Sequence, residues 1–224
     1  MAVSLVHEHK IRFYGSENLK NWEPLSDFGP AGYTGHDWEC PALFQLPVET
    51  KADADGHGNT KLSKWVLLVS CWGTKGPYMQ YFIGDFDGKT FHNNNPADFN
   101  QSVDYGDCFY AAIPWHLGMN RKTLLGWLVP GKVDVNPWRG QMSIPRDLSL
   151  RRTPEGIRLY QRPAALISKN LSRQSKGKKI SLNNISLNNN SLHPVSSTGN
   201  NKNTQTSNAY WAEATIDVTG TQKV

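Results

Sequence analysis

The chain has 224 residues, enough for one domain of β-propeller or β-sandwich size or for one domain and part of another. Its 19 Gly, 13 Pro and 8 Trp favour many short elements joined by turns, which is typical of all-β proteins. The formal net charge is +5, but the densest basic run, residues 173–179, lies in a Ser/Asn-rich segment without interleaved aromatics. This excludes the clustered footprint of a nucleic-acid-binding protein.

Cysteine spacing and hydrophobicity exclude further classes of protein. The three cysteines, Cys40, Cys71 and Cys108, show no C-x-x-C spacing, so neither a zinc site nor a disulfide framework is indicated. Phosphate-binding glycine loops are absent, and no apolar run is long enough to span a membrane. Residues 1–9 lack the basic start and apolar core of a signal peptide. The sequence therefore predicts no metal, no cofactor, no nucleic-acid partner and no membrane partner.

The N-terminal part predicts short strands. Residues 1–16 read as two strands, with His7 and His9 on one face of an extended segment. We interpret these histidines as a surface pair because no third ligand is spaced to complete a metal site. A turn-rich run, residues 29–35, leads toward a further strand over residues 42–48.

Two groups of strands follow. The first begins with the apolar run 65–72, which suits a strand buried on both faces, and continues through 78–86 and the turn pair Asp87-Gly88 to Phe91. The second comprises 104–112, 121–129, 142–150 and 157–160. Each group amounts to a meander of strands like one propeller blade. Their regular spacing without an amphipathic helix predicts an all-β fold, a propeller or a sandwich, and argues against an α/β enzyme.

The composition changes after residue 167. Residues 1–167 form the predicted β domain, residues 168–207 read as an Asn/Ser-rich low-complexity linker or insertion, and residues 208–224 return to a strand-like pattern. The last segment is interpreted as the start of a second β domain. Four sequences fit the N-glycosylation pattern, although Asn/Ser-rich sequence produces such matches by chance; they begin at Asn100, Asn170, Asn184 and Asn189.

The stretch Trp38-Glu39-Cys40-Pro41 supplies the candidate catalytic carboxylate. Pro41 disfavours a helix here, so Glu39 is expected at a strand end or in a loop with apolar neighbours. Apolar surroundings favour the protonated form of a carboxyl group, as a general acid working near neutral pH requires. The same residues are also compatible with Glu39 as a half-exposed structural residue.

Several segments together resemble glycoside hydrolase family 32, the invertases, inulinases, levanases and related β-fructofuranosidases. Residues 38–41 look like the W-E-C-P box of this family, and residues 81–88 match its Y-x-x-G-x-F-D-G hairpin. Residues 104–112 are similar to its D-Y-G-x-D-F-Y-A segment. Residues 126–127, 138–140 and 142–148 resemble its G-W-M, W-R-G and M-S-L-P-R-E-L runs. The matches occur in family order over residues 1–163.

The resemblance implies a five-bladed β-propeller followed by a β-sandwich. It also implies retaining hydrolysis of β-fructofuranosyl bonds in sucrose or in fructans such as inulin and levan, outside the cell or in a vacuole. Glu39 matches the acid/base. Tyr110 and Trp127 match aromatic positions of the pocket, where they bind substrate or pack within a blade. Cys40 belongs to the same box as Glu39, and we assign it to the substrate-binding group.

The departures from the family pattern are as informative as the matches. Neither W-M-N-D-P-N-G, which supplies the nucleophile, nor R-D-P, which holds the sugar, occurs in the sequence, and Cys108 stands where the family usually has Asp. We therefore expect an N-terminally truncated member: an incomplete propeller, inactive by itself, with the start of the sandwich at residues 208–224. The alternatives are a non-catalytic carbohydrate-binding or interaction propeller and a fructosyltransferase. The oligomeric state is not predicted.

Overall fold

A computed structural model describes residues 1–49, 62–73, 76–116, 122–130, 139–165 and 167. The chain divides into two compact units, Met1–Ser168 and Lys169–Val224. The predicted linker at 168–207 and the predicted sandwich start at 208–224 lie outside the described residues. Among the residues that are described, no helix is long and apolar enough to cross a membrane.

The described part of the first unit consists almost entirely of strands. Its elements in chain order are β1 (Ala2–Leu5), the 3₁₀ turn η1 (Val6–Glu8), β2 (Lys10–Gly15), β3 (Glu23–Phe28), β4 (Trp38–Glu49), β5 (Ser63–Gly73), β6 (Gly76–Phe86), β7 (Phe91–Asn93), β8 (Phe109–His116), β9 (Lys122–Leu128), β10 (Gln141–Met142), β11 (Arg146–Thr153) and β12 (Gly156–Pro163).

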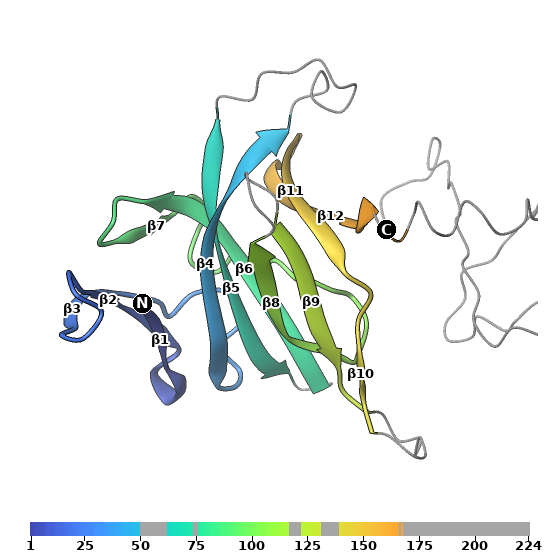
Figure 1. The fold of residues 1–224 in the computed structure, drawn as a ribbon, viewed down its shortest axis with the longest axis horizontal. Coiled ribbons are helices and arrows are strands. Elements are labelled where there is room, and N and C mark those ends of the chain that lie inside the picture. The colour runs from blue at the N-terminus through green and yellow to red at the C-terminus, as the bar shows by residue number, and fades with distance from the viewer. Residues whose placement is uncertain (50–61, 74–75, 117–121, 131–138, 166, 168–224) are drawn as a thin grey trace, which may run out of the picture. The chain divides into compact units, whose positions relative to one another are not determined.

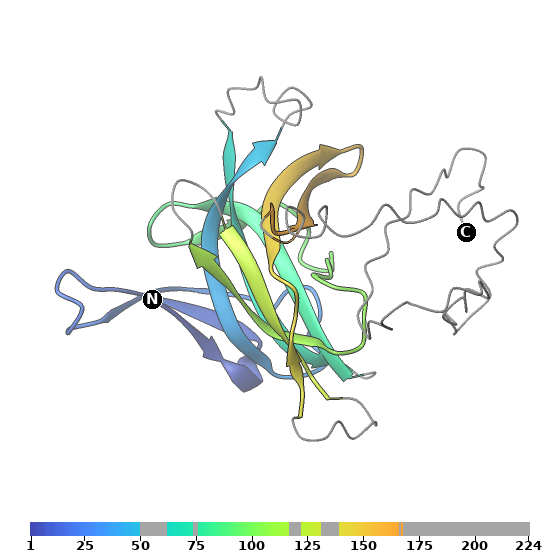
Figure 2. The same cartoon turned by 45° about the vertical axis from the view of Figure 1, so that its right-hand side comes forward.

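These strands form three consecutive antiparallel meanders. The order β1-β2-β3 makes a separate sheet, whereas β4-β5-β6-β7 forms the second meander and β8 to β12 form the third. The second and third meanders join through a short parallel pairing of β11 with β4, at Leu150 with Val48 and Arg151 with Glu49. Figure 1 shows the first and third groups on opposite sides of the β4–β7 meander, and Figure 2 shows the same arrangement after rotation.

Alternate residues of the central meander enter two different hydrophobic cores. Along β5, Val66 and Leu68 pack in the core shared with β8 to β12. Leu67 and Val69 pack in the core shared with β1 to β3. Because successive side chains of a strand point to opposite faces, a strand between two neighbouring sheets needs apolar residues at every position. The prediction of burial on both faces is confirmed for residues 66–71, whereas Trp65 is half-buried and Trp72 is exposed. The face-to-face meanders have the architecture of propeller blades.

Two features of the N-terminal region differ from the sequence prediction. The strand β3 was not predicted, because its sequence is mostly polar and exposed and shows no apolar alternation. His7 lies in the 3₁₀ turn, and His9 follows it with a left-handed backbone (φ 53°). The two histidines therefore do not share a strand face, and His7 Nδ1 lies 3.0 Å from Asp37 Oδ1.

Candidate active site

Glu39 is the second residue of β4 and follows a fully buried tryptophan. Trp38 has no exposed surface, its Nε1 donates to the carbonyl oxygen of Tyr33 at 2.8 Å, and its ring packs 5.8 Å from that of Phe82. Alternation along the strand turns Glu39 toward the opposite face, where it is exposed. The expected apolar surroundings therefore do not come from Trp38, which instead anchors the start of the strand.

A β-bulge directly follows Glu39. Glu39 pairs with Ser70 on β5, and the regular register resumes at Ala42 opposite Leu68. Two residues, Cys40 and Pro41, thus oppose one residue of the partner strand. Cys40 has a left-handed backbone with φ 46°, a conformation that is unfavourable for a residue other than glycine. Bulges of this kind redirect side chains and are common beside active sites.

Tyr110 connects β8 to Glu39. Its hydroxyl donates to Glu39 Oε2 at 2.5 Å, across 71 positions of sequence. Its side chain is 5% exposed, and its ring contacts that of Trp72 edge to face at 5.4 Å. Burial and, as the second largest cause, the hydrogen bond with Glu39 raise the pKa of Tyr110 well above its ordinary value. The phenol therefore stays protonated and remains a hydrogen-bond donor to the carboxylate at neutral pH.

Strand β8 repeats the distortion of β4. Tyr110 pairs with Trp127 on β9, and the register resumes at Ile113 opposite Leu125, so that Ala111 and Ala112 oppose one residue. Ala111 is left-handed, with φ 47°. Directly paired residues of antiparallel strands project to the same face, so Trp127, which is 42% exposed, lies beside Tyr110.

The glycine before Trp127 is required by packing. A Cβ on Gly126 would lie 2.5 Å from the ring of Phe109, so β8 and β9 approach this closely only with glycine there. The G-W pair is therefore one structural unit: the glycine permits the approach and Trp127 occupies the exposed face.

Cys40 is exposed within the first bulge, next to Glu39. The thiol itself is partly shielded from water, and this partial burial and then the charge of Glu39 raise its pKa, so the thiol is neutral at neutral pH. Among the described residues no cluster of three or more His, Cys, Asp or Glu is placed to hold a metal ion. The group near Glu39 thus contains one carboxylate, a phenol donor, a neutral thiol and the nearby aromatic ring of Trp127.

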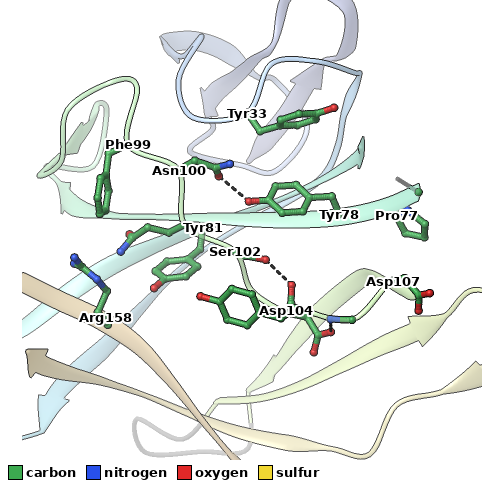
Figure 3. Close-up of a pocket in the computed structure, with 14 residues that line it drawn as sticks. Tyr33, Pro77, Tyr78, Tyr81, Phe99, Asn100, Ser102, Asp104, Asp107 and Arg158 are labelled. Carbon is green, nitrogen blue, oxygen red and sulfur yellow. Dashed lines mark hydrogen bonds between the residues drawn. The ribbon is translucent and has the colours of Figure 1, made fainter. Parts of the chain in front are cut away.

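The structure brings Glu39, Cys40 and Tyr110 together and pairs Trp127 with Tyr110. Sequence reasoning missed Trp72, whose position at the end of a buried apolar run is its only signal. A cavity of about 680 Å³ lies elsewhere, against β6 and the loop that precedes β8 (Figure 3). None of the four predicted residues lines this cavity.

Comparison with known proteins places the chain in a family. A model described as the glycosyl hydrolases family 32 N-terminal domain matches residues 1–163. A levanase from Bacillus subtilis (strain 168) is 40% identical over 190 residues, which cover 80% of this chain and 27% of the levanase. An extracellular exo-inulinase from Aspergillus niger is 35% identical over 181 residues, which cover 73% of this chain and 32% of the inulinase.

Solved structures agree with this assignment. The exo-inulinase from Aspergillus awamori superposes with a TM-score of 0.64 at 32% identity, over 75% of this chain and 34% of that one. The fructofuranosidase from Schwanniomyces occidentalis complexed with fructose gives a TM-score of 0.63 at 34% identity, over 73% of this chain and 32% of that one. The matched region thus spans about a quarter to a third of these relatives. The chain belongs to glycosyl hydrolase family 32, and its meanders are part of the β-propeller of that family's N-terminal domain.

Proposed function

We propose that this protein acts on β-fructofuranosyl bonds of sucrose or of fructans such as inulin and levan, with Glu39 as the general acid/base. The hydrogen bond from Tyr110 to Glu39 supports this assignment most directly, because it fixes the carboxylate of the W-E-C-P box at the start of a blade. Curated relatives named levanase, extracellular exo-inulinase and invertase support the substrate class and an extracellular location.

Glu39 takes part in both halves of a retaining reaction. In the first half its carboxylic acid gives a proton to the glycosidic oxygen, and the leaving alcohol departs while a second carboxylate bonds to the fructosyl carbon. In the second half Glu39, now ionised, accepts a proton from the water that hydrolyses this ester and is thereby reset. Such a nucleophile has to lie about 5–5.5 Å from Glu39.

The other predicted residues position Glu39 and the sugar. Tyr110, held protonated by burial, donates to the carboxylate and limits its rotation. Trp127 presents an exposed aromatic face on the adjacent strand, suited to stacking against a sugar ring. Cys40 contributes a neutral thiol beside Glu39, which avoids a second charge next to the acid/base.

The 224 residues contain neither the W-M-N-D-P-N-G box nor the R-D-P box. A retaining glycosidase cannot form its ester without a nucleophile, so we expect the chain alone to release no fructose from sucrose or inulin. A purified sample with calibrated fructose detection tests this expectation. Turnover that disappears in Glu39→Gln would contradict the claim that essential carboxylates are missing.

A chimera tests the role of Glu39 itself. Residues 1–163 replace the matching segment of the Bacillus subtilis levanase, whose remaining sequence completes the protein. We expect this chimera to hydrolyse levan, and Glu39→Gln to lower kcat by roughly 10²- to 10⁴-fold. β-Fructofuranosyl fluoride is the control substrate, because its leaving group needs no protonation and its first step should lose less rate. A chimera that keeps full activity after the Glu39→Gln substitution would refute the acid/base assignment.

A further inference from the structure

The cavity against β6 and the loop before β8 has no role in the reaction proposed above. It encloses about 680 Å³, within the range of sites that bind small molecules. Its walls come from β6, from the loop between β7 and β8, and from Arg158 on β12 (Figure 3). Along the loop before β8, the lining residues end at Asp107 and do not reach the strand that carries Tyr110. Glu39 is not among the lining residues.

Aromatic side chains form much of the lining. Tyr33 and Tyr78 meet edge to face with ring centroids 5.4 Å apart. Tyr105, on the loop before β8, is 96% exposed and leaves its ring free for contact with a ligand. Tyrosine rings supply apolar contact area together with a polar edge. This wall therefore suits a ligand that has both apolar C–H faces and polar groups.

Hydrogen-bonding groups in the cavity are held in place by their neighbours. The Tyr78 hydroxyl donates to Asn100 Oδ1 at 2.8 Å, which orients the amide N–H₂ group of Asn100 as a donor. Asp104 accepts from the backbone N–H of Gly106 at 2.8 Å and from Arg146 Nη1 at 2.6 Å. Polar groups fixed before binding lose little freedom when a ligand arrives.

The two ends of the cavity differ in charge. Figure 3 shows Arg158 at one end and Asp107 at the other. The Arg158 guanidinium lies 5.1 Å from the centroid of the Phe99 ring. Two aspartates in the lining disfavour an anionic ligand, and the density of donors and acceptors disfavours a wholly apolar one. A neutral polyhydroxylated ligand satisfies both constraints.

We propose that this cavity is a second carbohydrate-binding site, which holds a short run of fructosyl residues away from Glu39. The tyrosines contact the C–H faces of the sugar, while Asn100, Asp107 and Arg158 hydrogen-bond to its hydroxyls. The ligand class rests on the proposed function, whereas the place and character of the site rest on the cavity. Such a site would retain a polymeric substrate at the protein while single bonds are cut elsewhere.

Calorimetric titration of the full 224-residue chain with 1-kestose, and separately with inulin, tests this proposal. Production in a host without N-glycosylation keeps Asn100 unmodified. Tyr105→Ala and Asp107→Asn alter exposed side chains, so both variants should fold. We expect each to weaken kestose binding by about three- to tenfold, as for the loss of one stacking contact or hydrogen bond.

A matched control completes the experiment. Trp115→Ala removes an aromatic side chain that is 60% exposed and lies outside the cavity, and it should leave the dissociation constant unchanged. Wild-type affinity in both Tyr105→Ala and Asp107→Asn, or no binding by the unaltered chain, would overturn the second site. Neither result affects the levan assay of the Glu39→Gln chimera, so the two proposals fail separately.

Discussion

The left-handed residue Ala111 provides a quantitative test of the distorted strands beside Glu39. Its φ of 47° costs an L-residue about 1–2 kcal/mol relative to ordinary backbone conformations. Replacement by glycine removes that cost but adds about 0.5–1 kcal/mol of chain entropy to the unfolded state. The methyl group of Ala111 is only partly buried, so about half of the ~0.8 kcal/mol for a buried carbon is also lost.

These opposing contributions nearly cancel. We expect Ala111→Gly to change the free energy of unfolding by between about −0.4 and +1.1 kcal/mol relative to the unaltered chain. The neighbouring Ala112 is the matched control, because it is fully buried and lies outside the left-handed region. Ala112→Gly gains no relief of strain, loses the whole buried methyl contribution and should destabilise the fold by roughly 1.3–1.8 kcal/mol.

Urea unfolding followed by tryptophan fluorescence measures both variants against the unaltered chain. The informative quantity is the difference between the two free energies of unfolding, which should be about 1.4–2.4 kcal/mol because the chain-entropy cost is common to both variants. Equal destabilisation by the two substitutions would show that Ala111 is not left-handed in solution. The bulge that positions Tyr110 would then be absent.

Two further predictions concern the hydrogen bond to Glu39 and a buried thiol. In the active chimera, Tyr110→Phe should lower kcat by about ten- to a hundredfold, because a hydrogen bond to a charged group contributes roughly 1.5–3 kcal/mol. Levan hydrolysis measures this change. An unchanged kcat would show that Tyr110 does not contact Glu39. Burial raises the pKa of the Cys71 thiol from 9.0 to about 12. Between these two pH values the thiol loses its proton in the unfolded chain but keeps it in the folded chain, so the free energy of unfolding falls as the pH rises. Urea unfolding across this pH interval should show that the thiol lowers the free energy of unfolding by at most about 1.4 kcal/mol per pH unit, and Cys71→Ala should remove this contribution. The same pH dependence in Cys71→Ala would contradict the burial of the thiol.

The sequence predicted the parts of the fold that depend on strong local signals. A continuous apolar run indicated a strand buried on both faces, and the pair Asp87-Gly88 indicated a hairpin; in the structure Gly88 is left-handed, and the backbone N–H of Thr90 donates to Asp87 Oδ1. Both signals act over a few residues. The outer strand β3 gave no such signal, since exposed strands do not need an apolar face.

The surroundings of Glu39 depend on contacts between distant segments, which its neighbours in sequence do not report. The sequence prediction placed Trp38 and Cys40 around the carboxylate. In a regular strand, however, the residue before a given position faces away from it, as Trp38 does, whereas Cys40 stays near Glu39 because it lies in the bulge. The partner of Glu39 is Tyr110, and no residue type near either position indicates that contact. The left-handed backbones of Cys40 and Ala111 are equally silent in sequence, because such conformations are usually associated with glycine.

The two distortions together explain how neighbouring blades build one site. The second and third meanders each begin with a strand that places a polar side chain near its start, and a left-handed residue and a bulge follow at once. The bulge interrupts strand pairing directly after that side chain, while the rest of the strand pairs regularly with the next strand of the meander. Glu39 and Tyr110 are therefore held by different meanders and meet through their hydrogen bond. In the proposed reaction the second carboxylate comes from outside these two meanders, so we expect that complementing the chain with levanase sequence restores activity.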